Sequence, residues 1–141
     1  MVDKYNLSDN LIRWSSINDN DDFAIQCEVV GPGIQKNHMD LKENEIRIFN
    51  LYNITKGKYD DYSKLKEFCE VNNLPMVKVL EEGVFNYNLD ELLIKAEGQY
   101  DGGKNREGIV IRTIKEDYSS ALKGRLSFKV LNNKFLLKDE E

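Results

Sequence analysis

Four side chains that lie far apart in the sequence have types that could bind a ligand or a metal ion. Glu28 stands near the end of the apolar segment FAIQCEVV, shortly before a Gly-Pro-Gly turn and a Gln-Lys-Asn row. Phe49 offers an aromatic face of the kind on which a nucleobase stacks. Glu107 opens the apolar segment EGIVIR, where a carboxylate can reach a metal ion or a phosphate-bound cation. Lys129 lies between apolar residues, a costly position unless its amine meets an anion or reaches water.

Each of these residues also has a plain structural explanation. The segment around Glu28 is consistent with a surface hairpin, and charged residues such as Glu107 commonly begin strands. Phe49 is an ordinary core residue type, and Lys129 suits an edge strand from which it reaches solvent. His38, the only histidine, is expected at the surface without a role. Local sequence alone therefore leaves both explanations open.

The composition indicates a globular protein with one compact domain. The chain has 141 residues, of which 40% are hydrophobic and 32% are charged, and its formal net charge is −5. That charge argues weakly against a dedicated nucleic-acid binder, although a local basic patch can exist on an acidic chain. Apolar runs are too short to span a membrane, and the N-terminus lacks a signal-peptide layout. Cys27 and Cys69 show no pairing or metal-ligand spacing, so we expect reduced core thiols and a cytoplasmic location.

The elements expected from periodicity alternate between helices and strands. The spacing of apolar residues predicts helices near the start of the chain, over residues 60–73 and over residues 88–98. Apolar or alternating runs predict strands over residues 23–30, 46–54, 76–80, 107–114 and 126–131. This order predicts an α+β fold, with a mixed, mainly antiparallel sheet and flanking helices.

Two of these elements carry more detailed expectations. In the strand over residues 46–54, alternation places Ile46, Ile48 and Asn50 on one face and Phe49 and Leu51 on the other. In the helix over residues 88–98, Asn88 is the expected N-cap, with Glu91 at capping-box spacing. Its expected buried stripe consists of Leu89, Leu92, Leu93 and Ala96.

Taken in order, the segments CEVVGPGIQKN, IRIFN, EGIVIR and SFKVLNNKF resemble the later motifs of one family. That family consists of the ATP-dependent RNA ligases of the nick-sealing, RNA ligase 2-like class. These ligases belong to the covalent nucleotidyltransferase superfamily. The resemblance covers residues 22–138. It implies that residues 1–141 form a single domain, the C-terminal portion of an RNA ligase adenylyltransferase domain with a partial nucleotidyltransferase (ATP-grasp-like ligase) fold.

The resemblance also implies an activity and a set of roles. Such ligases transfer AMP from ATP to a lysine, then to an RNA 5′-phosphate, and seal the nick with a 3′-hydroxyl, as in RNA repair. By matching motifs, Glu28 would bind the ribose of adenosine and Phe49 would stack on adenine. Glu107 would act near the α-phosphate and its metal ion, and Lys129 would contact the α-phosphate. The implied cofactors are ATP and Mg²⁺, and the implied substrates are RNA ends or a nicked duplex.

Three departures from the family pattern qualify that expectation. The nucleophile motif K-x-D-G is absent, and KYDD at Lys58 lacks the glycine and follows Glu28 instead of preceding it. Leu131 stands where a second motif lysine is usual, and Lys134 is out of register to replace it. Cys27 occupies a position that is usually glycine.

The missing motif leaves several expectations open. The chain is expected to be a fragment, a split gene product or a truncated reading frame, inactive as a ligase alone. A separate N-terminal chain would then supply the lysine nucleophile. The alternatives are a non-catalytic nucleotide- or RNA-end-binding module, and a structural remnant of a ligase. An exposed sheet edge, left by the absent front section, predicts self-association.

Overall fold

The computed structural model describes residues 1–139, which fold into two compact units. Unit 1 comprises Met1–Val30, Asn44–Lys78 and Ile114–Glu116. Unit 2 comprises Gly31–Glu43, Val79–Thr113 and the chain from Asp117 onward. Each unit has a hydrophobic core of its own. Within residues 1–139, no helix has the length and apolar character needed to cross a membrane.

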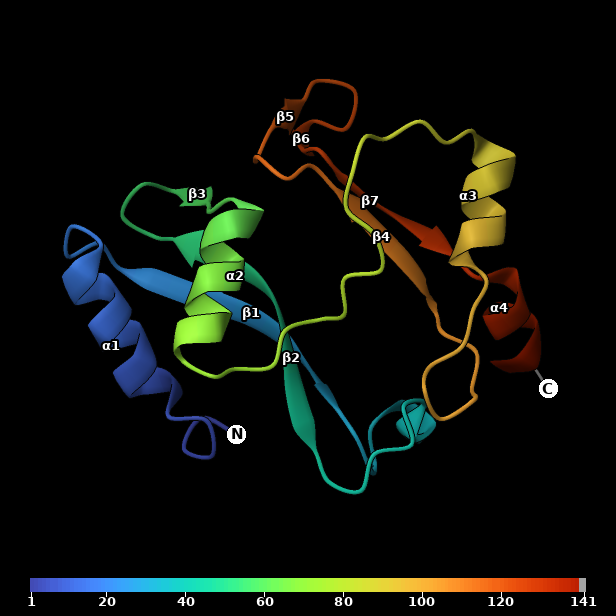
Figure 1. The fold of residues 1–141 in the computed structure, drawn as a ribbon, viewed down its shortest axis with the longest axis horizontal. Helices are drawn as coiled ribbons and strands as arrows, with labels where there is room; N and C mark the ends of the chain where they lie inside the picture. The colour runs from blue at the N-terminus through green and yellow to red at the C-terminus, as the bar shows by residue number, and fades with distance from the viewer. Residues whose placement is uncertain (140–141) are drawn as a thin grey trace. The chain divides into compact units, whose positions relative to one another are not determined.

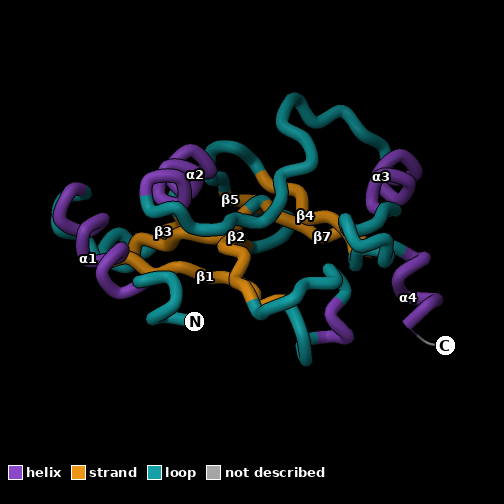
Figure 2. The backbone as a smooth tube through the Cα atoms, turned by 60° about the horizontal axis from the view of Figure 1, so that its bottom comes forward, coloured by secondary structure: helices purple, strands orange, loops and turns teal. Residues whose placement is uncertain are grey.

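Unit 1 is built on a three-stranded antiparallel sheet in the order β1-β2-β3 (Figure 1). Its strands are β1 (Phe23–Val30), β2 (Glu45–Asn53) and β3 (Lys58–Tyr59). Two helices, α1 (Leu7–Ile17) and α2 (Tyr62–Val71), contribute to the same core as the sheet. Figure 2 shows α2 lying along one face of this sheet. The strands predicted over residues 23–30 and 46–54 and the helix predicted over residues 60–73 are therefore confirmed.

The core of unit 1 joins apolar side chains from both helices and from β2. Trp14 is central, since its ring makes T-shaped contacts with Phe23 and Phe68 at centroid distances of 6.4 and 5.3 Å. The indole N–H of Trp14 is buried and has no hydrogen-bond partner among the described residues. The buried members are Leu7, Trp14, Ile46, Ile48, Leu51, Leu65, Phe68, Cys69 and Leu74.

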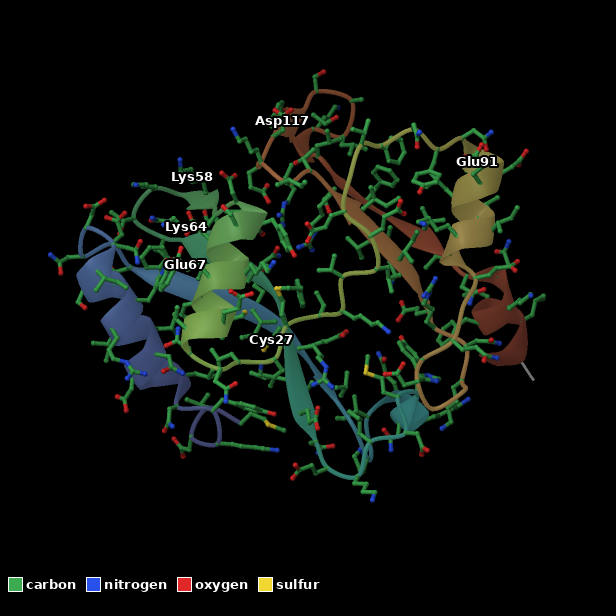
Figure 3. The ribbon with its side chains drawn as sticks, viewed as in Figure 1. Cys27, Lys58, Lys64, Glu67, Glu91 and Asp117 are labelled. Carbon is green, nitrogen blue, oxygen red and sulfur yellow. The ribbon has the colours of Figure 1, made fainter. Side chains whose placement is uncertain are left out.

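Both cysteines belong to this region, as predicted. Cys69 is buried in the core, and burial, followed by the nearby Glu70 carboxylate, raises the pKa of its thiol to about 11. Cys27 (labelled in Figure 3) is half-buried and packs against the core. Burial is also the main cause that raises the pKa of the Cys27 thiol, with a smaller effect from Glu28. Neither cysteine forms a disulfide.

The pairing of β1 with β2 contains a bulge at Phe49. Gln26 pairs with Asn50, whereas the next residue, Cys27, pairs with Ile48. Phe49 is therefore the extra residue on β2 and has no cross-strand partner in this register. Such a bulge bends the strand and changes the direction of its side chains.

The bulge changes which residues of β2 face the core. Leu51 joins Ile46 and Ile48 in the core of unit 1. The Asn50 side chain instead donates a hydrogen bond of 2.6 Å to the Gln26 side chain on the neighbouring strand. The prediction that placed Asn50 with Ile46 and Ile48, and Leu51 opposite them, was therefore wrong, because it assumed unbroken alternation.

The predicted strand over residues 76–80 is also wrong. Only one parallel bridge forms there, between Ile48 and Met76. It is held by hydrogen bonds of 3.0 Å from the Ile48 N–H to the Pro75 carbonyl and from the Val77 N–H to the Ile48 carbonyl. On this edge of β2, β3 pairs only with Tyr52 and Asn53, and the segment after Pro75 leaves the edge after its single bridge at Ile48.

Unit 2 contains two small antiparallel sheets. One pairs β4 (Gly108–Arg112) with β7 (Ser127–Leu131), and the other pairs β5 (Tyr118–Ser119) with β6 (Gly124–Arg125). The helices are α3 (Leu89–Ala96), α4 (Asn133–Asp139) and the short 3-10 turn η1 (Gln35–Asn37). The α+β class, with mainly antiparallel strands and flanking helices, is confirmed. The strands are divided among three sheets instead of forming one mixed sheet.

Helix α3 begins where the sequence predicts. The Asn88 side chain accepts a 2.9 Å hydrogen bond from the N–H of Glu91, which Figure 3 shows at the start of this helix. Leu92 and Ala96 pack on Ile109 and Val130 of the β4–β7 sheet, so half of the predicted stripe is correct. The other half is wrong, because Leu89 and Leu93 are 69% and 36% exposed. A two-stranded sheet covers only a narrow stripe of the helix.

Candidate functional site

Two of the predicted site residues, Glu107 and Lys129, meet in unit 2. Lys129 lies in β7 opposite Val110 of β4. Its ammonium group forms an ion pair and hydrogen bond with the Glu107 carboxylate. The prediction that this lysine needs an anion or solvent is confirmed, since the Lys129 and Glu107 side chains are also 44% and 42% exposed.

The backbone of Glu107 is fixed by the fully buried Asn132. The backbone N–H of Asn132 donates to the Glu107 carbonyl at 2.8 Å, and its side-chain amide donates to the Arg106 carbonyl at 2.8 Å. The side-chain oxygen of Asn132 accepts from the Lys134 N–H at 3.0 Å. One buried amide thus joins the residues before β4 to the start of α4.

Arg106 fixes the same segment from the other side. Its guanidinium donates to the carbonyls of Lys95 and Glu97 at 2.7 and 3.2 Å, which lie at the end of α3. A cation at a helix C-terminus satisfies carbonyls that lack partners within the helix. Gly98 leaves room for this contact, because a Cβ there would lie 2.6 Å from the Arg106 guanidinium carbon.

The face of the β4–β7 sheet that carries Lys129 is open within unit 2. Ile109 and Val130 point into the core, and the alternate residues Val110 and Leu131 are 54% and 43% exposed. Leu131 therefore shares the face of Lys129, at the position where the family pattern has a second lysine. Lys134, which lies on α4, does not replace that lysine, since its ammonium pairs with Glu97 at a distance of 3.1 Å.

The other two predicted residues, Glu28 and Phe49, lie in unit 1. Glu28 is exposed on β1 and pairs across the sheet with Arg47, whose guanidinium contacts Glu45 at 2.6 Å. Phe49 is half-buried at the bulge of β2. The structure thus joins Glu107 to Lys129 in unit 2 and places Glu28 and Phe49 on neighbouring strands of unit 1.

A hollow of about 270 Å³ in unit 2 adjoins Glu107. It involves residues for which the sequence predicted no role, including His38, expected at the surface but half-buried against Phe135. Their positions in the sequence could have identified them. Gln35, Lys36 and His38 closely follow the Gly-Pro-Gly turn, and Phe135 lies in the segment SFKVLNNKF. The lining residues are Gln35, Lys36, His38, Glu107 and Phe135.

The carboxylates of the described residues do not form a protein cage for a metal ion. Within residues 1–139 there is no group of three or more His, Cys, Asp or Glu side chains that could hold one. A single carboxylate at Glu107 still fits a hard cation that takes its other ligands from phosphate and water, as Mg²⁺ often does. Among the described residues, Glu107 therefore offers one carboxylate ligand for such an ion, not a complete coordination sphere.

The antiparallel sheets with flanking helices match part of the RNA ligase fold. The chain belongs to the RNA ligase family, whose model matches residues 2–131. The resemblance predicted from the four sequence motifs is therefore confirmed.

Solved structures of Naegleria gruberi RNA ligase share this fold. A lysine-to-methionine variant with AMP and Mn is 23% identical, with a TM-score of 0.79 over 97% of this chain and 39% of that chain. A lysine-to-alanine variant with ATP and Mn is 24% identical, with a TM-score of 0.72 over 91% and 39%. The ligase with PPi is 24% identical, with a TM-score of 0.73 over 92% and 40%. This chain thus spans about two fifths of the ligase that it matches. No curated protein matches it.

Proposed function

We propose that this chain binds the adenosine nucleotide of an RNA ligase reaction, as the C-terminal portion of an adenylyltransferase domain. The observation that carries the proposal is the Glu107–Lys129 pair on the open face of β4 and β7. Membership of the RNA ligase family supports it, as does the binding of ATP and AMP by the Naegleria ligase.

Lys129 is the residue that we assign to the α-phosphate. Phosphoryl transfer depends on positioning and on cationic charge near the phosphate oxygens. An ammonium group supplies that charge as a compact point with three donors. Since Leu131 adds no second cation on this face, Lys129 would carry the contact alone among the motif positions of β7.

Glu107 is the residue that we assign to a divalent cation, Mg²⁺ by expectation. The bound ion would neutralise phosphate charge, and the Glu107 carboxylate would hold it while phosphate and water complete its coordination. Asn132 and Arg106 support this role, because they hold the backbone at Glu107 while its side chain stays accessible. Naegleria ligase structures with AMP or ATP contain Mn, another divalent cation.

Glu28 and Phe49 are the residues that we assign to the adenosine, with Glu28 on the ribose and Phe49 on the adenine. The adjacency of their strands supports this pairing. The bulge supports the role of Phe49, because bulges commonly redirect a side chain next to functional sites. A carboxylate accepts hydrogen bonds from ribose hydroxyls, and an aromatic ring stacks on any base.

The sealing of RNA ends is the activity that the family membership suggests for the intact enzyme. The 141 residues contain no K-x-D-G motif, so the chain has no assigned nucleophile for AMP. This observation favours nucleotide and RNA-end binding as the function of the chain alone, with sealing dependent on a lysine supplied by another segment.

Titration with AMP tests the adenosine site. We expect Phe49→Ala to weaken AMP binding by about 1–3 kcal/mol, because it removes base stacking. Tyr52→Ala is the matched control, an aromatic truncation in the same strand beyond the bulge, and should bind as the unmodified chain does. The measurement is isothermal titration calorimetry with Mg²⁺ present. Absence of saturable AMP binding, or equal affinities for the two variants, would contradict the proposal.

A further inference from the structure

Of the residues that the structure describes, Asn132 is the only polar residue buried in unit 2. It is 0% exposed, whereas the other buried polar residues all lie in unit 1: Asn10, Asp21, Asn50 and Asn53. Burial of an amide costs free energy unless its donors and its acceptor are paired. The partners of this amide therefore indicate what the residue does.

One half of the amide caps helix α4. The backbone carbonyl of Asn132 accepts hydrogen bonds from the N–H groups of Phe135 and Leu136, at 3.1 and 3.2 Å. Its side-chain oxygen accepts a hydrogen bond from the N–H of Lys134 at 3.0 Å. This is the arrangement of an N-cap, which serine, threonine and aspartate also provide. Capping explains the oxygen of this side chain and leaves its nitrogen to be explained.

The nitrogen of the amide reaches back to the segment before β4. It donates to the Arg106 carbonyl at 2.8 Å, and the backbone N–H of Asn132 donates to the Glu107 carbonyl at 2.8 Å. These two carbonyls belong to the two peptide groups that flank the Cα atom of Glu107. Because each peptide group is planar, φ and ψ of Glu107 are the only soft rotations between them. Holding both groups therefore restricts the direction of the Glu107 Cα–Cβ bond.

The direction of that bond matters because Glu107 would act as a solitary carboxylate ligand. Among the residues that the structure describes, no group of three or more His, Cys, Asp or Glu side chains could hold a metal ion. Neighbouring ligands from the protein thus cannot compensate for a misplaced Glu107. Residues that hydrogen-bond behind a metal ligand orient it, and their loss typically lowers metal affinity by about 10–100-fold.

We infer that Asn132 is a positioning residue for the divalent cation at Glu107. The inference rests on the proposed function, which assigns the cation to that carboxylate. Asn132 contacts neither the cation nor the nucleotide, and it sets the direction from which the carboxylate meets the cation. Figure 1 shows β7 leading into α4, with Asn132 between them. The start of that helix and the placement of the metal ligand therefore depend on one side chain.

Asn132→Thr separates the two halves of the amide. Threonine has nearly the volume of asparagine and its hydroxyl still caps α4, whereas its methyl group cannot donate to the Arg106 carbonyl. Asn53→Thr is the matched control in unit 1, at another buried asparagine that ends a strand. The Asn53 side chain likewise accepts from a backbone N–H, that of Lys56 at 2.8 Å, and donates to an oxygen, that of the Asp21 carboxylate at 2.9 Å.

The measurement is the dependence of AMP affinity on Mg²⁺ concentration, followed by isothermal titration calorimetry on protein that circular dichroism shows to be folded. We expect Asn132→Thr to need about tenfold more Mg²⁺ to reach half of the full affinity, because a poorly oriented carboxylate holds the cation weakly. At saturating Mg²⁺ it should bind AMP as tightly as the unmodified chain. Asn53→Thr should need no more Mg²⁺ than the unmodified chain.

Three results would overturn the inference. The first is an unchanged Mg²⁺ requirement in Asn132→Thr, and the second is a weakened AMP affinity that saturating Mg²⁺ does not restore. The third is an equal change in Asn53→Thr, which would show a general loosening of the fold. If Asn132→Thr does not fold, Asn132→Ser takes its place, since serine keeps the cap with a smaller side chain.

Glu107→Ala separates failure of the inference from failure of the proposed function. If the unmodified chain shows no Mg²⁺ dependence, or Glu107→Ala keeps that dependence, Glu107 is not the metal ligand and both are contradicted. If Glu107→Ala loses the dependence while Asn132→Thr behaves as the unmodified chain does, only the role of Asn132 is contradicted.

Discussion

At the scale of single residues, the Glu107–Lys129 pair has little to contribute to folding. Both side chains are more than two fifths exposed, and exposed ion pairs typically contribute about 0.2–1 kcal/mol. The proposed role of this pair in ligand binding can therefore be tested without a large loss of stability.

The proposed role of Lys129 predicts that its removal weakens AMP binding much more than it lowers the stability of the fold. We expect Lys129→Ala to change the free energy of unfolding by less than about 1 kcal/mol, because it removes only an exposed ion pair. AMP binding should fall about tenfold or more, because a charged contact to phosphate is lost. Urea denaturation measures the first effect and calorimetric AMP titration the second.

Lys134→Ala is the control for that comparison. It removes another exposed ion pair of unit 2, Lys134 with Glu97 at 3.1 Å, from outside the proposed site. It should alter stability as little as Lys129→Ala does and should leave AMP affinity unchanged. If both variants bind AMP equally well, Lys129 has no special part in nucleotide binding.

The sequence predicted some of these residues and missed others for a physical reason. Lys129 was identifiable because an ammonium group in an apolar strand must find an anion or water. Asn132 and Arg106 were not, since they act on backbone carbonyls that only the folded chain brings near. His38 was likewise assigned no role, because its contact with Phe135 joins positions far apart in sequence.

At the scale of elements, the glycine of EGIVIR has a steric explanation. Gly108 pairs with Leu131 at the end of the β4–β7 ladder. A Cβ at Gly108 would collide with the carbonyl oxygen of Val130 and lie 3.1 Å from the Cα of Leu131. The motif therefore needs a glycine so that the two strands approach closely beside Glu107.

Gly108→Ala should destabilise the protein by about 1–3 kcal/mol, because the strands must separate to admit the methyl group. Gly124→Ala, in β6 of the same unit, has nothing within 4 Å of the added Cβ and should stay within about 0.5 kcal/mol. Urea denaturation of both variants measures the difference. Equal stabilities would show that the sheet relaxes around the methyl group.

The elements were predictable where periodicity was long and regular. The strand over residues 23–30 and the helices around Trp14 and Phe68 follow from apolar spacing alone. The bulge at Phe49 was not, since it depends on the register between two strands. The failed strand over residues 76–80 shows the same limit, because its pairing with the edge of β2 stops at one bridge, and apolar periodicity does not reveal how far two segments stay paired.

At the scale of the whole molecule, the missing nucleophile motif gives a clear expectation. With Mg²⁺ and ATP labelled at the α-phosphate, the chain alone should acquire no acid-stable label, since no K-x-D-G occurs in its 141 residues. Addition of a segment that contains K-x-D-G should produce a labelled lysine if the two together make the enzyme. Gel electrophoresis after acid precipitation is the measurement. A labelled band from the chain alone would show that another of its lysines is the nucleophile.

The position of Trp14 has a spectroscopic consequence. It is the only tryptophan, it is 3% exposed, and its indole N–H lacks a partner in the apolar core of unit 1. Its fluorescence should therefore be blue-shifted in the native protein and move to longer wavelength as that core becomes hydrated. Tryptophan emission thus reports on unit 1 specifically, and a thermal melt monitored by it would follow the unit that carries Glu28 and Phe49.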